Sequence, residues 1–466
     1  MCLWKEWWEW AGALRPACAR HRTYLWMLAA LAGFCVRGDL LGVTSIVRAL
    51  GLREACYDRV LDFFHSNAVD VSALTRIWAA LVLKAHPGLL RWNDRLVLVA
   101  DGIKVPKSGK KMPAVKRLHQ ASESNSKPEF IMGHSCQAVA LLVRGLRSVA
   151  AIPLVARISE GLVFSNRDKR TLLDKLILLL AELAITQPYY LVADAYYASK
   201  KIALPLLKQG NHLVTRVRTT AVGYFPAPPP QTKKRGRPKR YGEKVALRNL
   251  FKETQAFQSV DSPVYGEERI QLRLRALDLL WRPVGVLVRF VAVDHPTRGR
   301  CLLMTTDLSL EPVDIVRLYG YRFKIEVAFK QALRVVGAFL YHFWMRDMTP
   351  TKRNAGNQYM HRKSKPYRDA IIRKMNAYHR FIQLGLIAQG IMVAIATTKP
   401  ELVWRHFGSW LRTIRPNVCP SEMVVAIALR NSLPIFLADN DCAPDLTKFI
   451  QENLDLERAE GIRLAA

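Results

Sequence analysis

The sequence is poor in acidic residues, with 38 Asp and Glu against 70 Lys and Arg and a formal net charge of +32. Such an imbalance does not bear on fold, but it indicates the kind of partner that the protein meets. Nucleic acid is the first candidate, and an anionic membrane surface is the second. A basic enzyme with no polyanionic partner is the third interpretation, and composition alone leaves all three open.

The sequence also lacks any regular cysteine pattern. Its eight cysteines are irregularly spaced, and none of them forms a C-x-x-C pair. This spacing argues against a zinc module and against a disulfide framework. Reduced and mostly buried thiols, as in a cytoplasmic protein, fit the pattern better.

Long uninterrupted apolar runs are missing as well. Leu384–Ala396 is too short to cross a bilayer, and Ala138–Ala156 is interrupted by Arg144 and Arg147. The first ten residues, MCLWKEWWEW, contain two glutamates and no continuous apolar core, unlike a signal peptide. We therefore expect a soluble, cytoplasmic protein with no membrane partner.

A chain of 466 residues, half of them hydrophobic, has enough material for two or three domains. Residues 1–92 carry apolar side chains at helical spacing, which predicts a helical N-terminal domain. Within it, two helices separated by a short turn near Gly51 have the form of a helix-turn-helix. An ordinary helical hairpin is the alternative interpretation, so DNA binding by this pair stays open.

Residues 93–220 change to an alternation of strands and helices. Two apolar runs stand out because each is followed by a carboxylate: Leu96–Ala100 precedes Asp101, and Tyr190–Ala193 precedes Asp194. With the segments between and after them, the order is β-β-β-α-β-α-β. Such an order predicts an α/β domain that contains a mixed sheet.

Residues 221–305 begin with a Pro-rich and basic loop that contains Arg235-Gly236-Arg237-Pro238. This tetrapeptide has the form of an AT-hook, in which two arginines enter a narrow minor groove. A solvated basic loop is the alternative interpretation. The strands expected within Leu272–Val293 carry Trp281 and predict a small β insertion.

Residues 306–345 return to helix and contain Glu326. Residues 346–466 are expected to form a helical C-terminal region, which contains a second basic stretch at Met348–Lys374. We expect helices at Asn376–Thr398 and at Glu422–Leu433, the second of them ended by Pro434.

Three carboxylates stand out by position: Asp101, Asp194 and Glu326. If the strands before the two aspartates are adjacent, the side chains lie together, and their repulsion favours a cation between them. Mg²⁺ or Mn²⁺ suits such oxygen ligands, and a pair of these ions can promote phosphodiester chemistry. Taken singly, each acid has an ordinary alternative, a helix N-cap for an aspartate and a surface ion pair for the glutamate.

Three motifs carry a resemblance to a known family: Asp101-Gly102-Ile103-Lys104, Asp194-Ala195-Tyr196-Tyr197, and Tyr319-x-x-Arg322-x-x-x-Glu326. Over roughly residues 94–340 the chain resembles bacterial insertion-sequence transposases of the DDE class. This resemblance implies an α/β fold with an RNase H-like mixed sheet flanked by helices and interrupted by a β insertion. The helical N-terminal and C-terminal regions lie outside that core.

The resemblance also implies roles for individual residues. The catalytic and metal-binding residues would be Asp101, Asp194 and Glu326, which together hold two Mg²⁺ or Mn²⁺ ions. The family's lysine is expected at the position of Leu333, so a neighbouring cation would have to replace it. The implied DNA contacts are Tyr319, Arg322, Lys330, Arg334, Lys104, Arg235, Arg237 and Trp281. For Trp281, a core position is the alternative to stacking on a base.

By the same resemblance, the protein binds terminal inverted repeats as a homodimer, cleaves at the ends of the element and joins the 3′-OH ends to target DNA. It would act on the nucleoid of a bacterial cell. Two alternatives remain: a metal-dependent nuclease that never joins strands, and a catalytically decayed DNA-binding protein.

Overall fold

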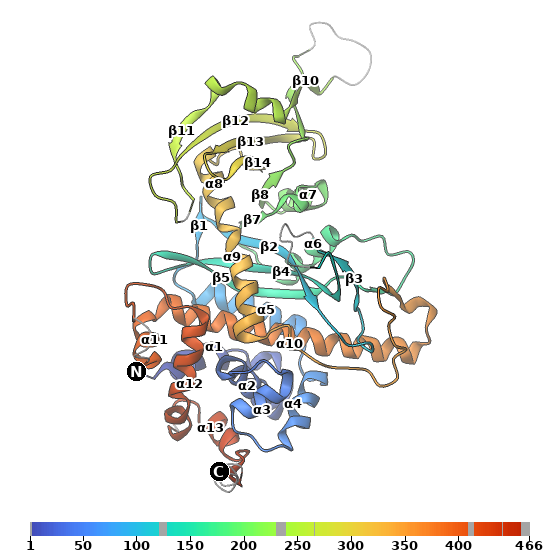
Figure 1. Ribbon diagram of the computed structural model, residues 1–466, viewed down its shortest axis with the longest axis vertical. Coiled ribbons are helices and arrows are strands. Elements are labelled where there is room, and N and C mark those ends of the chain that lie inside the picture. The colour runs from blue at the N-terminus through green and yellow to red at the C-terminus, as the bar shows by residue number, and fades with distance from the viewer. Residues whose placement is uncertain are drawn as a thin grey trace. The chain divides into compact units, whose positions relative to one another are not determined.

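The computed structural model describes residues 2–120, 128–229, 239–264, 266–408, 414–439 and 441–457 (Figure 1). Its residues form two compact units. Unit 1 comprises Met1–Leu90, Gly102–Ile185 and Ile325–Ala466, and unit 2 comprises Arg91–Asp101 and Thr186–Lys324. Each unit therefore combines segments that are far apart in the sequence.

The helices of unit 1 come from both ends of the chain. Those of the N-terminal part are α1 (Leu3–Gly12), η1 (Arg15–Ala17), α2 (His21–Val36), α3 (Gly42–Ala49), α4 (Cys56–His65) and α5 (Val71–Ala85). Those of the C-terminal part are η6 (Met360–Arg362), α10 (Lys365–Thr398), α11 (Pro400–Phe407), α12 (Glu422–Ala438) and α13 (Pro444–Gln451). Helix α6 (Leu172–Glu182) lies between them in sequence.

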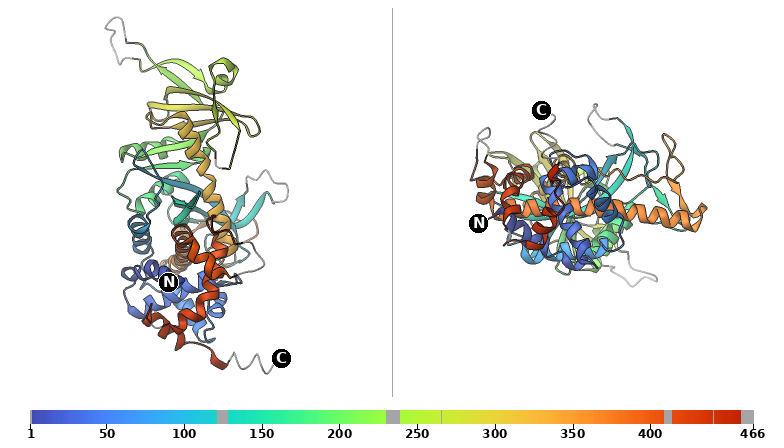
Figure 2. Two further views of the ribbon diagram at one scale, coloured as in Figure 1. Left: turned by 90° about the vertical axis from the view of Figure 1, so that its left-hand side faces the viewer. Right: turned by 90° about the horizontal axis from the view of Figure 1, so that it is seen from below.

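Helix α10 is the central element of unit 1, and Figure 2 shows it as a single long helix. It packs against β5 (Ser148–Ile158) and against α2, α4, α5 and α12. By length and composition α10 could cross a membrane, with a mean hydropathy of 1.7 over its most apolar window. Because 89% of that window is buried inside the structure, α10 has the character of a core helix.

Unit 1 also contains an antiparallel set of strands. These are the end of β2 (Arg95–Pro106), β3 (Lys116–His119), β4 (Phe130–Gly145) and β5. A tight turn at Leu146–Arg147, with φ of 52° at Arg147, joins β4 to β5. A separate parallel pair consists of β6 (Leu162–Val163) and β15 (Gln358–Tyr359).

Unit 2 is built on a larger sheet. It contains β1 (Arg91–Trp92), the first part of β2, β7 (Tyr189–Ala193), β8 (His212–Val217), β9 (Val222–Pro226), β10 (Tyr241–Ala246), β11 (Gln258–Asp261), β12 (Gln271–Trp281), β13 (Val286–His295) and β14 (Gly299–Thr305). Its helices are η2 (Ala195–Tyr197), α7 (Lys200–Lys208), η3 (Leu247–Lys252), η4 (Thr254–Ala256) and α8 (Pro312–Tyr321).

Strand β2 belongs to both units; in unit 2 it pairs with β7, which pairs with β8, and in unit 1 β4 pairs with β3 and with β5. Strands β2, β7 and β8 are parallel, whereas β4 and β5 are antiparallel to each other. This is the RNase H-like mixed sheet that the sequence predicted. Strands β9 to β14 enter between β8 and α8, so the predicted β insertion is confirmed as well.

Three expectations about individual elements were wrong. Helix α10 begins at Lys365 rather than at Asn376, because Pro366 suits the first turn of a helix and the basic stretch before Asn376 continues it. Helix α12 runs through Pro434 to Ala438, and the burial of Phe436 against Trp4 stabilises the turn beyond the proline. Strand β2 continues past Asp101 to Pro106, so Asp101 lies within the strand.

Candidate active site

Three neighbouring parallel strands place the two predicted aspartates side by side. In the register of the sheet, Ala100 of β2 faces Ala193 of β7, and Ala193 faces Thr215 of β8. Asp101 and Asp194 follow the first of these pairs directly. Since neighbouring strands lie about 5 Å apart, the two carboxylates start from adjacent points of the same edge.

Asp101 is bonded to an arginine that lies far away in the sequence. Arg322 donates a hydrogen bond from Nη1 to Oδ2 of Asp101 at 3.0 Å, and the two side chains are 19% and 20% exposed. Arg322 follows the last residue of α8 and has helical backbone angles, so the chain continues in helical form into α9 (Phe323–Gln331). The arginine of the third motif therefore reaches the aspartate of the first.

Asp194 also has a structural role. Its Oδ1 accepts a hydrogen bond from the backbone N–H of Tyr196 at 3.0 Å, which caps η2. The Thr215 hydroxyl donates to the backbone carbonyl of Asp194 at 2.7 Å. The alternative interpretation of Asp194 as a cap is thus correct for one carboxylate oxygen, and the cap itself holds the side chain in one orientation at the edge of the sheet.

Tyr319 lies among the same charged groups. Burial raises the pKa of its hydroxyl, the positive charges of Arg322 and Arg216 oppose that rise, and the negative charge of Asp194 adds to it. Unit 2 therefore brings together both aspartates, Tyr319 and Arg322, four of the residues that the motifs singled out.

Arg216 is the one residue of this group that the sequence analysis missed. It follows Thr215 on β8 and is exposed, which puts a cation beside Asp194 in the sheet register. The signal was an arginine that interrupts the apolar strand His212–Val217, but its position beside the aspartates depends on the pairing of β7 with β8.

Glu326 lies one helical turn after Arg322, on α9. It belongs to unit 1, whereas both aspartates belong to unit 2, so the complete triad stays a prediction. Within the described ranges of the chain, no group of three or more His, Cys, Asp or Glu side chains could hold a metal ion.

The two cations proposed to replace the family's lysine differ in local structure. Lys330 lies on α9, whereas Arg334 lies in η5 (Ala332–Val336), a π-helical segment that directly continues α9. Both side chains are exposed.

The remaining predicted DNA contacts have different surroundings. Lys104 is exposed on β2, and its Nζ donates to the carbonyl of His119 at 2.5 Å. Trp281 ends β12 with 7% of its surface exposed, which agrees with the core interpretation. Arg235 and Arg237 lie outside the described residues.

The donor set in unit 2 fits a hard divalent cation. Two carboxylates at one edge of a sheet supply the oxygen ligands that Mg²⁺ and Mn²⁺ prefer. In the structure the Arg322 guanidinium supplies the positive charge next to Asp101. The edge of the sheet is therefore a position where a cation is stabilised.

Two carboxylates at one edge of adjacent parallel strands are a donor set that suits the divalent metal ions of phosphodiester cleavage. The comparison with protein families agrees: the family model described as "DDE superfamily endonuclease" matches residues 14–275, more than half of the chain. The chain belongs to this family. The matched range includes Asp101 and Asp194, whereas Glu326 lies beyond it.

Two further comparisons add little. None of the curated proteins matches the chain. Among solved structures, the chain is similar to a piggyBac transposase in a synaptic complex with hairpin DNA, determined by cryo-EM. The identity is 12%, the alignment covers 96% of this chain and 82% of that one, and the TM-score is 0.37. At this level the similarity carries no argument about the protein.

Proposed function

We propose that the protein is a DNA transposase that binds terminal inverted repeats, cleaves at the ends of its element and joins the 3′-OH ends to target DNA. The observation that carries the proposal is the pairing of β2 with β7, which sets Asp101 beside Asp194 in a chain of the DDE endonuclease family. The helix that follows Arg322 supplies the third acid, Glu326.

In this proposal Asp101, Asp194 and Glu326 hold two Mg²⁺ or Mn²⁺ ions. When bound, such ions supply activation of the attacking oxygen and neutralisation of the charge that develops on the leaving oxygen. The chain's own residues orient the DNA. Asp194 is fixed by its bond to Tyr196, so its carboxylate needs little reorganisation on binding.

The cations of unit 2 would hold the phosphates next to the scissile bond. Arg322 offers a planar guanidinium suited to bidentate phosphate contacts, and it would exchange Asp101 for a phosphate when metal ions are bound. Arg216 and Tyr319 interact electrostatically with each other and would contact the adjacent phosphate.

On the helix of Glu326, the π-helical segment favours Arg334 as the replacement for the missing lysine. A π-helical turn closes with an i to i+5 bond and therefore takes one more residue than an α-helical turn. The position two turns after Glu326 on the same face of the helix therefore shifts from Leu333 toward Arg334. Lys330, one α-helical turn after Glu326, is the other candidate.

Several wider features belong to the same proposal. The α3 and α4 helices are a candidate DNA-reading pair, and Arg235 and Arg237 are candidate minor-groove contacts. A homodimer would pair the two ends, and Lys104 would add a phosphate contact near the first aspartate.

Trp281 is 7% exposed, so its burial does not support a role in stacking on a base. We place the protein in the cytoplasm of a bacterium, on the nucleoid.

The test is cleavage of DNA that carries the sequences flanking the protein's own gene. With Mg²⁺, the wild-type protein is expected to cut at the element ends and to join labelled, pre-cut ends to a target plasmid. Asp194→Asn should abolish both reactions while DNA binding persists, because asparagine can still accept the bond from Tyr196. Cleavage without any joined product would instead support a metal-dependent nuclease. Binding without cleavage by the wild type would support a decayed DNA-binding protein.

A further inference from the structure

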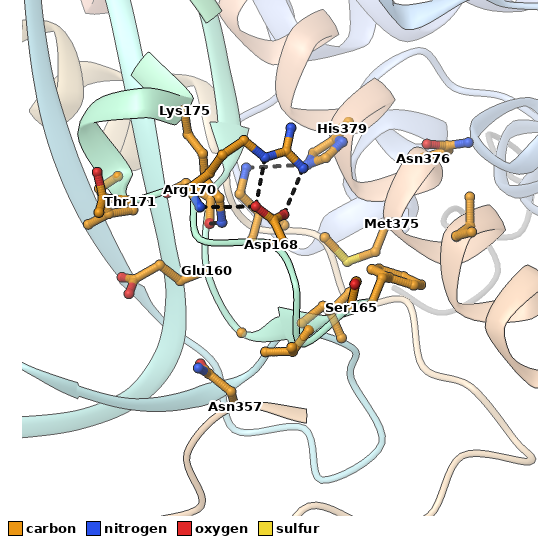
Figure 3. Close-up of a pocket in the computed structure, with 18 residues that line it drawn as sticks. Glu160, Ser165, Asp168, Arg170, Thr171, Lys175, Asn357, Met375, Asn376 and His379 are labelled. Carbon is orange, nitrogen blue, oxygen red and sulfur yellow. Dashed lines mark hydrogen bonds and ion pairs between the residues drawn. The ribbon is translucent and has the colours of Figure 1, made fainter. Parts of the chain in front are cut away.

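A pocket of about 520 Å³ opens in unit 1, and none of the described residues that line it belongs to the candidate active site (Figure 3). Its walls are formed by the chain from the end of β5 through β6 to the start of α6, by Asn357 and by the first half of α10. Its apolar side chains include Phe164, Ile372 and Met375. A volume of this size lies within the range of about 300–1,000 Å³ that is typical of sites for small organic groups.

The acidic groups of the pocket are already compensated. Asp168 accepts two hydrogen bonds from the Arg170 guanidinium, at 2.8 and 2.7 Å, and Figure 3 shows the two side chains facing each other. Glu160 forms an ion pair with Lys116 at 3.3 Å. A bound group therefore meets little uncompensated negative charge in the pocket.

The neutral polar side chains of the pocket are three hydroxyls (Ser159, Ser165 and Thr171), two amides and an imidazole. Within the described residues, the side chains of Asn357 and Asn376 make no hydrogen bond. Burial lowers the pKa of His379 to about 3, so the ring is neutral, and its Nε2 accepts a hydrogen bond from the Ile158 N–H at 3.3 Å. Paired donors and acceptors of an amide are suited to the edge of a nucleobase.

Cations lie close in sequence to residues that line the pocket or contact its lining. The stretch from Trp344 to Lys374 holds nine Lys and Arg residues against two Asp residues. Of these, Arg362, Lys363 and Arg373 are exposed, and none forms an ion pair with a carboxylate of the described chain. His361 lies 3.4 Å from the Val163 carbonyl, which holds the first two cations beside β6. We call these three cations the rim.

The rim is supported by its own small core. Met345, Met348, Met360 and Ile371 are buried together and pack against Leu162, Tyr367 and Met375. The pairing of β15 with β6 and the bond from the Gln358 amide to the Val115 carbonyl at 3.0 Å add to it. The rim and the pocket wall therefore belong to one packed structure.

We propose that this pocket binds one unpaired nucleobase of a DNA strand, while the rim cations bind the phosphates on either side of it. The choice of DNA rests on the proposed function. Apolar walls accept the face of a base, the free amides contact its edge, and the cations match the charge of the backbone. Bases of an intact duplex are stacked and paired, so they cannot enter.

The first test compares fluorescence anisotropy of labelled oligonucleotides of about ten nucleotides, a length typical of single-strand sites. A chelator is present throughout, so that no cleavage occurs. The full-length protein is expected to bind oligothymidine about tenfold more tightly than an oligonucleotide of abasic residues with the same phosphates. Equal affinity for the two, tighter binding of the duplex, or tighter binding of the matching RNA would overturn the proposal.

Variants separate the pocket from the rim. Phe164→Ala, and the double change Asn357→Ala with Asn376→Ala, should each weaken oligothymidine binding several-fold and leave abasic binding unchanged. Neutralising the rim (Arg362→Gln, Lys363→Gln and Arg373→Gln) should weaken both and lower the slope of log K against log[salt] by about 2. A matched control removes three exposed cations elsewhere in unit 1: Lys84→Gln, Arg405→Gln and Lys448→Gln. An equal effect of the control variant would contradict the proposal that the rim cations bind the phosphates.

Failure of this proposal can be distinguished from failure of the proposed function. Asp101→Asn should end cleavage and leave oligothymidine binding unchanged. A wild-type protein that binds oligothymidine in the expected way but never cuts DNA would refute the proposed nuclease activity and would still support base binding by the pocket. A protein that cuts DNA but ignores the bases of a single strand would refute the pocket alone.

Discussion

At the scale of single residues, the most informative contact is the one between Arg322 and Asp101. In the proposed function Asp101 binds a metal ion, and Arg322 competes with that ion for the same oxygen atoms. Its presence at 3.0 Å lowers the repulsion between the two aspartates when no ion is bound. The contact therefore links metal affinity to the position of the arginine.

Replacing Arg322 with glutamine should strengthen metal binding. With the guanidinium removed, Asp101 and Asp194 repel each other more strongly, so Mn²⁺ should bind several-fold more tightly while DNA cleavage falls. The measurement is the increase in Tm on adding Mn²⁺, which follows ligand affinity. Arg317→Gln serves as the control, because Arg317 pairs with Asp314 on the same helix. Unchanged or weaker Mn²⁺ binding in the Arg322 variant would contradict the competition.

Lys107 is a second residue with an unusual environment. It is 7% exposed, and its Nζ donates to the carbonyls of Phe339 and Tyr341 at 2.5 and 3.2 Å. The ammonium also lies 3.8 Å from the centre of the Tyr341 ring. These contacts join the end of β2 to the segment that follows the helix of Glu326.

Burial lowers the pKa of Lys107 from 10.5 to about 7, which predicts a pH-dependent stability. Between these values the unfolded chain binds a proton that the folded chain does not, so the contribution of Lys107 to stability rises with pH from about 7 to 10.5. The Lys107→Met variant should therefore have its greatest stability relative to the wild type below pH 7. This difference in the free energy of unfolding should fall by an amount on the order of 4 kcal/mol by pH 10.

The measurement for Lys107 is denaturant unfolding at several pH values between 6 and 10. Lys104→Met is the control, since Lys104 is an exposed lysine on the same strand. A difference between Lys107→Met and wild type that does not vary with pH would show that the lysine is not destabilised by its burial.

At the scale of elements, the helix that carries Glu326 is irregular where a functional cation is expected. It passes from α-helical to π-helical form at Ala332 and ends at Gly337, which has a φ of 67°. Buried Arg37 donates to the carbonyl of Val336 at this end, and a side chain at Gly337 would collide with Arg37. The end of the helix is thus fixed by a partner near the N-terminus of the chain.

Because of the π-helical turn, we expect Arg334 to matter more than Lys330. Arg334→Gln should reduce the rate of cleavage at element ends by about tenfold, the size of one lost charged hydrogen bond. Lys330→Gln should have a smaller effect. Single-turnover cleavage rates at saturating protein measure both, and a larger loss at Lys330 would exclude this assignment.

At the scale of the whole molecule, unit 1 is held together by polar contacts between distant segments. Arg157 on β5 donates to Glu182 on α6 at 2.7 Å, to Thr75 on α5 at 2.6 Å and to Gln383 on α10 at 2.8 Å. The guanidinium is 14% exposed and the carboxylate 20%. A single buried cation therefore connects four elements from three parts of the sequence.

Removal of the charge on Glu182 should destabilise unit 1 strongly. Glu182→Gln leaves Arg157 buried without its counter-charge, and the expected loss is about 3 kcal/mol. Urea unfolding monitored by tryptophan fluorescence measures it. Asp369→Asn, which removes the acid of an exposed ion pair with Lys365, should cause no measurable change. Equal stability of the Glu182 variant would mean that the other acceptors suffice for Arg157.

Local patterns in the sequence determined much of this protein. The apolar runs before Asp101 and Asp194 specified the two central strands, and the spacing of Tyr319, Arg322 and Glu326 specified one helical stretch. Periodicity is a property of neighbouring residues, and these elements follow it closely. Pro434 is one exception, because packing of Phe436 outweighs the bond lost at the proline; the start of α10 and the end of β2 are two others.

Only the tertiary structure decided which residues meet. The bond between Arg322 and Asp101, the place of Arg216 beside Asp194, and the pocket between β6 and α10 all join segments that are remote in the sequence. No periodicity carries such information, since strand register and helix packing arise from the whole set of buried contacts. The sequence therefore predicted the chemistry of the carboxylates, whereas the fold selected the cations that accompany them.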